Sequence, residues 1–304
     1  ESSGGAVLAP KMCSDDSTSD DWRSFRAKLV AQEQGQDMDA EGEENSGTAE
    51  GGWVYDANNV VETGSVLLGG SLQEFGFGLR QQYFHKCVLL LLAHEERVFT
   101  QGVIVNRPTS HTTARGWRIW YGGDVKGIAA PLQQQETACL HRLDSQLAKA
   151  VSRTVIPGIY VTSLEMAEQL VDAGHASAQD FWVFVGYAGW APGQLQMEID
   201  SRSSWHVAAV SSGVLLNQLI AQSSKEETLG AGIDVWNKMM RRIGLQARVD
   251  DERLEFADLM LKEWARVHLQ DNKSEALESL LKTARRRARG GRGTPAGSLL
   301  RARC

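Results

Sequence analysis

One stretch of this 304-residue chain, from Phe181 to Ile199, constrains the fold more than any other. Its first five residues are bulky and either aromatic or β-branched, which favours a strand buried on both faces over a helix. Residues that punctuate secondary structure follow at once, namely Gly186, Gly189, Pro192 and Gly193. Glycines at this density permit a positive φ or the close approach of another backbone. We therefore predict a buried strand that ends in a sharp corner.

The corner carries three side chains with polar tips, Tyr187, Trp190 and Gln194. Buried tyrosine and tryptophan usually find hydrogen-bond partners within the protein, so one interpretation is a packed corner of the core. The other interpretation is the wall of a pocket, in which the aromatic faces, the hydroxyl, the indole N–H and the amide meet a ligand. The residues alone leave both open.

Two apolar segments earlier in the chain predict a β-hairpin. The run Cys87–Ala93 is far shorter than the roughly 20 residues of a membrane-spanning helix, so we expect a buried strand and no transmembrane segment. A second strand begins near Gln101, and the residues from His94 to Thr100 join the two. This second strand is expected to end in Asn106-Arg107-Pro108, because the proline has no backbone N–H to donate and so stops the strand.

The remaining elements are both strands and helices. Thr162 and Glu165 form a capping box that predicts the start of a helix, and Gly174 ends it. The other expected strands are Gly64–Gly70, Trp117–Val125, Ile159–Thr162 and Trp205–Val210, and the expected helices after them are Val214–Gln222 and Gly232–Gly244. Beyond Arg248, apolar residues at helical spacing predict two further helices.

Several of these segments together resemble motifs of the AlgH/YqgE-like family. They are Gly186-Tyr-Ala-Gly-Trp190 with Pro192-Gly-Gln-Leu195, Gly64–Gly70, Tyr83–His94, Gln101–Pro108 and the pair Gly122-Gly123. The resemblance runs from about Gly64 to Leu245. Two positions depart from the family pattern, because Asp124 replaces a proline after the paired glycines and Gln196 replaces an acidic residue.

The resemblance implies a fold more than a function. Family members occur in bacteria and plant plastids, and the family has no established biochemical activity. We expect an α+β fold, a single domain with a mixed, partly curled (barrel-like) β-sheet and outer helices, plus a helical C-terminal extension. The curl is implied by the resemblance and not by periodicity.

Composition divides the chain into four expected parts. Residues 1–52 form an acidic, mostly disordered leader, residues 53–248 the AlgH/YqgE-like domain, residues 249–284 a helical extension and residues 285–304 a basic tail. The first 50 residues hold 12 acidic and 4 basic side chains, whereas Lys282 to Cys304 hold 8 basic and no acidic ones. Charge runs of this kind are usually solvated.

One helix is expected inside the leader, at about residues 20–33. Asp20 or Asp21 caps it, and it places Trp22, Phe25, Leu29 and Val30 on one face. This segment is also similar to the leader helix of plastid-type members of the family. A short isolated helix is marginal in water, so we predict that this face docks, either on the protein's own domain or on a partner.

The sequence contains no motif that predicts a catalytic, cofactor-binding or metal-binding residue. A nucleophile elbow, a phosphate-binding loop, a dinucleotide fingerprint and a metalloprotease helix are all absent from it. His94-Glu95-Glu96 is the nearest approach to an acid/base or metal cluster, but in a hairpin loop a solvated charge group is the simpler interpretation. The four cysteines show no C-x-x-C spacing, which argues against a zinc site and a disulfide framework.

A candidate binding site remains where strand ends converge. We expect one concavity to be lined by Asn106, Arg107, Pro108, Gly122, Gly123, Tyr187, Trp190 and Gln194. Loops at strand ends are common places for sites, and Arg107 offers a planar donor fork for a carboxylate or phosphate. The alternative is that Arg107 pairs with a structural carboxylate such as Glu198.

Three functions are compatible with these features. The first is a non-enzymatic binding or regulatory protein of AlgH/YqgE-like type, whose partner is an unknown protein or a small anionic ligand. The second is an enzyme of unknown reaction that uses a pocket near Arg107 and Tyr187. The third is a nucleic-acid-associated factor acting through the arginine-rich tail, which lacks the aromatic residues that stack on bases.

The expected location is the plastid stroma, on the strength of the leader's resemblance, and otherwise the cytoplasm. The chain opens at Glu1 rather than Met, so we expect a preceding piece, with any signal or transit peptide, to be missing from it.

Overall fold

The computed structural model describes residues 22–33, 52–70, 78–202, 204–223, 230, 232–251 and 255–270. It divides into two units, residues 1–49 and residues 50–304. The described part of the first unit is helix α1 (Trp22–Glu33), where the leader helix was expected. The basic tail at residues 285–304 and the second predicted helix of the extension lie outside the described residues.

The predicted docking face of α1 is largely open to solvent. Trp22, Phe25 and Leu29 are 48%, 61% and 42% exposed, whereas Arg23, Ala27 and Ala31 are the buried positions. The guanidinium of Arg26 lies over the Trp22 ring, 3.4 Å from its centroid. Docking of this face therefore stays a prediction.

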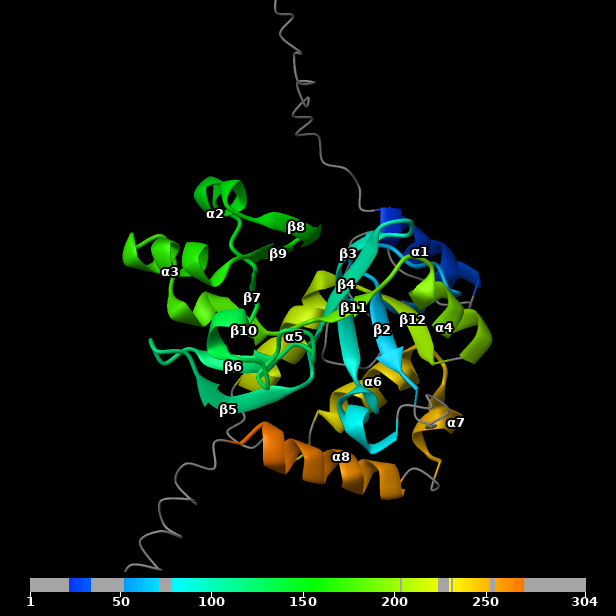
Figure 1. Cartoon of the computed structure of the whole chain (residues 1–304). Helices are drawn as coiled ribbons and strands as arrows, with labels where there is room; N and C mark the ends of the chain where they lie inside the picture. The colour runs from blue at the N-terminus through cyan, green and yellow to red at the C-terminus, as the bar shows by residue number, and fades with distance from the viewer. Residues whose placement is uncertain are drawn as a thin grey trace, which may run out of the picture. The chain divides into compact units, whose positions relative to one another are not determined.

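The second unit contains two six-stranded sheets (Figure 1). The first is antiparallel throughout, in the order β1 (Val54–Asp56), β12 (Trp205–Val210), β2 (Val66–Gly69), β3 (Val88–Glu95), β4 (Phe99–Ile104) and β11 (Ala188–Trp190). The second has the order β5 (Pro108–Thr112), β6 (Arg118–Tyr121), β10 (Phe181–Val185), β7 (Thr137–His141), β9 (Ile159–Thr162) and β8 (Arg153–Ile156). Its β6–β10 pair is parallel and its other pairs are antiparallel.

The α+β class is confirmed, although the strands divide between two sheets where one mixed sheet was expected. Val88 and Val103 lie in the first sheet and Val183 in the second. The sheets are joined where strands leave them, since the Ile104 amide donates to the Gly122 carbonyl and the Gly122 amide to the Val185 carbonyl, both at 2.9 Å. Within the described residues neither sheet closes into a barrel.

The corner after β10 is where the chain passes from the second sheet to the first. Gly186 has φ +76°, and a Cβ built on it would lie 2.3 Å from the Gly123 carbonyl oxygen and 2.5 Å from the Gly127 Cα. A side chain at this position would collide with backbone, so the predicted sharp corner requires glycine here.

Local boundaries differ from the predictions in two places. The β3–β4 hairpin is present, with Leu90 opposite Val103, but Pro108 begins β5 rather than ending β4. The first residue of a strand needs no donor, so a proline fits there. Helix α3 (Leu164–Asp172) is capped by Ser163, whose hydroxyl accepts from the Met166 amide, because Thr162 still belongs to β9.

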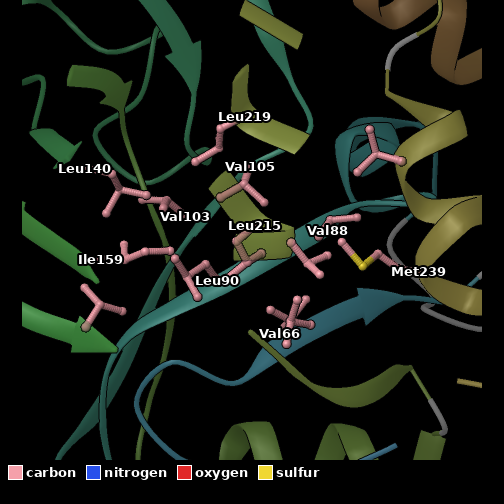
Figure 2. Packing of buried hydrophobic residues seen from close by; sticks show 14 of the residues in the cluster. Val66, Val88, Leu90, Val103, Val105, Leu140, Ile159, Leu215, Leu219 and Met239 are labelled. Atoms are coloured by element: carbon pink, nitrogen blue, oxygen red, sulfur yellow. The ribbon is translucent and has the colours of Figure 1, made fainter. Parts of the chain in front are cut away.

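The main core lies between the sheets and two helices, α5 (Ser212–Ser223) and α6 (Ile233–Arg242). Figure 2 shows Leu215 and Leu219 of α5 and Met239 of α6 in one cluster with residues of both sheets. The sheet residues labelled there are Val66, Val88, Leu90, Val103, Leu140 and Ile159. A smaller cluster packs helices α2 (Gln146–Ala150) and α3 against the second sheet.

The remaining helices of the second unit are spread over both sheets. They are η1 (Gly78–Phe84), η2 (Leu132–Gln134), η3 (Ala178–Asp180), α4 (Gln194–Arg202), α7 (Gln246–Val249) and α8 (Glu255–His268). Helix α8 is the first of the two predicted after Arg248, and it buries Leu261 and Ala265. Among the described residues, none of the helices is both long and apolar enough to cross a bilayer.

Candidate functional site

Asn106 and Arg107 are fully buried, and their side chains form hydrogen bonds with main-chain groups. The Asn106 amide accepts from the Val88 N–H at 2.8 Å and donates to the Lys86 carbonyl at 3.0 Å. The Arg107 guanidinium donates to the carbonyls of Tyr83 and His85, at 3.2 and 2.7 Å. Burial lowers the pKa of Arg107 to about 10, so the group is charged at neutral pH. It stabilises the turn that ends η1.

The paired glycines lie against the corner after β10. A Cβ on Gly122 would meet the Gly186 carbonyl oxygen at 2.3 Å, and one on Gly123 would meet the Tyr187 carbonyl oxygen at 2.4 Å. Val125 and Tyr187 exchange main-chain hydrogen bonds of 3.1 Å next to them. Close packing of two backbones therefore accounts for both glycines.

Trp190 and Gln194 belong to a separate cluster around a buried carboxylate. Glu198 accepts hydrogen bonds of 2.9 Å from the indoles of Trp190 and Trp205 and from the Gln194 amide. It is thus engaged with these donors and is not the partner of Arg107. For Trp190 the packed-corner interpretation describes the structure.

A cavity of about 170 Å³ opens beside this cluster. Its lining includes His94 and Thr100 from the β3–β4 hairpin and Leu195 and Gln196 from α4. The His94 imidazole is hydrogen-bonded to the Thr100 hydroxyl at 2.8 Å. Within the residues that the structure describes, His, Cys, Asp and Glu do not gather in a group that would hold a metal ion.

A cluster of charged and polar side chains that the sequence did not single out lies at the turn His85-Lys86, whose His85 carbonyl accepts from Arg107. Both side chains are buried, at 5% and 3% exposure. His85 Nε2 lies 2.7 Å from one carboxylate oxygen of Asp258, and Lys86 Nζ donates to the other at 2.8 Å. Asp258 belongs to α8, so the last described helix brings a carboxylate to two buried donors of the main domain.

The backbone at this turn is held in a conformation that lysine rarely adopts. Lys86 has φ +50°, a region in which a side chain is strained by roughly 1 kcal/mol or more. The Asn106 side chain donates to the Lys86 carbonyl and the Arg107 side chain to the His85 carbonyl, and these hydrogen bonds fix the turn. The predicted residues Asn106 and Arg107 therefore shape the cluster without touching its anion.

The protonation states in the cluster follow from burial and from the partners. Burial lowers the pKa of His85, although its bond to Asp258 opposes the shift, so the imidazole is neutral and donates its Nε2–H. Burial raises the pKa of Asp258, but the hydrogen bonds from His85 and Lys86 outweigh it and the net shift is downward. Asp258 is therefore a carboxylate paired with the Lys86 ammonium.

Aromatic rings enclose the cluster on the side of α8. The Trp264 ring lies 5.6 Å from the Tyr83 ring and 5.1 Å from the Tyr121 ring, centroid to centroid. Burial is the main cause of the raised pKa of both tyrosines, so both phenols stay neutral. The site therefore offers a buried cation and a neutral donor beside an apolar aromatic wall.

A model of the AlgH-like family matches residues 76–248, which is more than half of the chain. The chain belongs to the AlgH-like family. Its relatives include a "UPF0301 protein" of Albidiferax ferrireducens, 26% identical over 174 residues, covering 52% of this chain and 86% of the relative. Another, from Chlorobaculum tepidum, is 30% identical over 155 residues, covering 50% and 78%.

Solved structures of similar proteins include the crystal structure of protein DIP2367 from Corynebacterium diphtheriae, with a TM-score of 0.45 and 20% identity over 64% of this chain and 94% of that one. They also include the solution structure of AlgH from Pseudomonas aeruginosa, with a TM-score of 0.39 and 17% identity over 60% and 90%.

The family match separates the two sides of the cluster. Tyr83, His85, Lys86 and Tyr121 lie inside residues 76–248, whereas α8 begins at Glu255, beyond the match. In this AlgH-like protein the donors thus belong to the matched family range, and the carboxylate bound to them belongs to a helix outside that range.

Proposed function

We propose that this AlgH-like protein is a non-enzymatic binding or regulatory protein whose site is the His85-Lys86 turn. The observation that carries the proposal is the Asp258 carboxylate, each oxygen of which is bound by one buried donor. A carboxylate or phosphate group from a ligand presents the same acceptor oxygens. Asp258 therefore occupies the anion site formed by His85 and Lys86, and an anionic group of a ligand replaces it there.

The chemistry of the neighbouring groups supports binding over catalysis. Burial raises the pKa of the Cys87 thiol, which follows Lys86 in the chain, to about 12, and a protonated thiol is a poor nucleophile. His85 donates to an anion and is neutral, which suits recognition of an acceptor.

The likeness of the leader to the leader helix of plastid-type family members supports a location in the plastid stroma. Imaging of a fluorescent fusion in plant cells tests that location.

Removal of the internal carboxylate tests the site. In the full chain, Asp258→Ala leaves two buried donors for an added anion, and inorganic phosphate is the probe, followed by NMR of the His85 ring. We expect the variant to bind phosphate about tenfold more tightly than the wild type, because the competing carboxylate is gone.

Two further variants make this result specific. Glu263→Ala removes an exposed carboxylate of the same helix, which pairs with Arg266, and should bind phosphate as the wild type does. Asp258→Ala combined with Lys86→Gln should lose the gain. Equal phosphate binding by the wild type and Asp258→Ala would overturn the proposal.

A further inference from the structure

We propose that the surface beneath α8 is a docking groove for an amphipathic helix of a partner protein. That helix carries a carboxylate followed, three and six positions later, by an aliphatic and an aromatic side chain. The inference rests on the proposed function, because its carboxylate subsite is the His85-Lys86 turn. It adds the class of ligand, which is a helix and not a free anion.

The contacts of α8 extend well beyond the carboxylate. From Asp258 the buried line continues through Leu261 and Ala265 to Leu269, whose carbonyl accepts from the Ser110 amide at 2.8 Å. The eleven steps along the chain from Asp258 to Leu269, which follows the last residue of α8, span about 16 Å at the helical rise, and this is longer than a phosphate or a small carboxylic acid. In Figure 1 the last turn of α8 lies next to β5, the strand that contains Ser110.

The receiving surface has the chemistry of a helix-binding groove. Its anchors on α8 are Asp258, Leu261 and Trp264, which fall on one face at spacings of three. Trp264 meets the Tyr121 ring edge-on, at an interplanar angle of 73°, a favourable aromatic geometry. A charged anchor beside aliphatic and aromatic anchors on one helical stripe is typical of helix-in-groove recognition.

The receiving residues and the helix have different origins. Tyr83, His85, Lys86, Ser110 and Tyr121 all lie within the matched family range, and α8 does not. The groove is therefore a surface of the family domain itself. A helix from another chain that presents the same anchors has the same complement to bind.

Helix α8 commits only part of its apolar surface to the groove. Within residues 255–270 the buried apolar side chains are Leu261, Ala265 and Leu269. Phe256 and Leu259 are 71% and 62% exposed. A partner helix that buries more apolar area against the domain gains free energy over α8 and displaces it.

A peptide with the sequence of residues 255–270, labelled with a fluorophore, tests whether the groove accepts a helix from another molecule. The receptors are two full-length chains, the wild type and Leu261→Asp, in which a charge at a fully buried position releases α8. By fluorescence anisotropy we expect the peptide to bind Leu261→Asp, and to bind the wild type about tenfold more weakly because its own α8 competes.

Peptide variants show which anchors matter. Changing Asp258 to Ala in the peptide should weaken binding about tenfold, because two hydrogen bonds to an anion are lost. Changing the exposed Glu263 to Ala should leave binding unchanged. A second released receptor, Trp264→Ala, replaces Leu261→Asp if circular dichroism shows that the latter is unfolded.

The outcomes separate the two proposals. If the peptide fails to bind folded, α8-released chains while phosphate still binds Asp258→Ala, the helix-groove inference is overturned and the anion site stands. If phosphate also fails to bind, the proposed function falls with it.

Discussion

His141 is held as a single neutral tautomer by bonds at both ring nitrogens. Its Nδ1 accepts from the Leu143 amide at 3.2 Å, and its Nε2 lies 2.8 Å from the Ser152 hydroxyl oxygen. That hydroxyl donates onward to the Ala148 carbonyl, so it accepts from the imidazole. Burial lowers the pKa of His141 to about 4, because it disfavours the charged imidazolium.

This arrangement predicts a loss of stability in mild acid. The pKa of His141 is about 4 in the folded protein and roughly 6.5 in the unfolded chain, so below pH 6.5 the unfolded state binds more protons. The free energy of unfolding should fall as the pH drops from 6.5 to 4, by about 2 to 3 kcal/mol from this group. Urea unfolding at pH 7 and pH 4.5 measures the change.

The variant His141→Asn isolates the contribution of this residue from that of His85, whose pKa is also lowered. An asparagine oxygen replaces Nδ1 as the acceptor for Leu143 but takes up no proton. The variant should be less stable at pH 7 and should lose less stability on acidification. Parallel pH profiles for the wild type and His141→Asn would contradict the assignment.

The corner after β10 shows how an element depends on one backbone position. Gly186→Ala should destabilise the protein by about 3 kcal/mol or more, because the added methyl group overlaps the Gly123 carbonyl and the Gly127 Cα. Gly174→Ala is the matched control, since Gly174 has φ +73° with no atom within 4 Å of an added Cβ. It should cost only about 1 kcal/mol.

Thermal or chemical denaturation of the two variants measures the difference. The positive φ is common to both glycines, so the excess for Gly186→Ala reports the collision of the methyl group with neighbouring backbone. Similar losses in both variants would show that the corner relaxes to accommodate a side chain.

The elements were predictable where the signal is local. Short apolar runs rich in aliphatic, aromatic or β-branched residues located β3, β10 and the β3–β4 hairpin, and helical spacing located α6 and α8. Boundaries were less secure, as Pro108 and Ser163 show, because a proline or a hydroxyl fits either side of a strand or helix end. The division into two sheets was missed, since it depends on pairings between strands far apart in sequence.

The candidate site was predictable only in part for the same reason. Asn106, Arg107 and the glycines carry a recognisable pattern, but hydrogen bonds to main chain and close backbone packing use them within the fold. The cluster that holds an anion joins Lys86 to Asp258, 172 residues away. Sequence spacing carries no signal for such a pair, and a lone histidine gave no reason to connect His85 with α8.

At the scale of the whole molecule, the chain leaves the first sheet and later returns to it. Strands β1 to β4 come from residues 54–104, and β11 and β12 from residues 188–210. The second sheet comes entirely from residues 108–185 between them. The strands of the second sheet are thus contiguous in sequence. In the first sheet, by contrast, β1 pairs with the distant strand β12, with Val54 opposite Val210.

This order has a consequence for synthesis on the ribosome. All strands of the second sheet have left the exit tunnel before β12 does, and β2 presents an unpaired edge until β12 arrives. Closing the shorter chain segments costs less entropy, so the inserted sheet should assemble first. In pulsed hydrogen exchange during refolding, the Val183 amide of the second sheet should gain protection before the Val207 amide of the first sheet. The reverse order would show that the first sheet folds before the second, which would contradict this prediction.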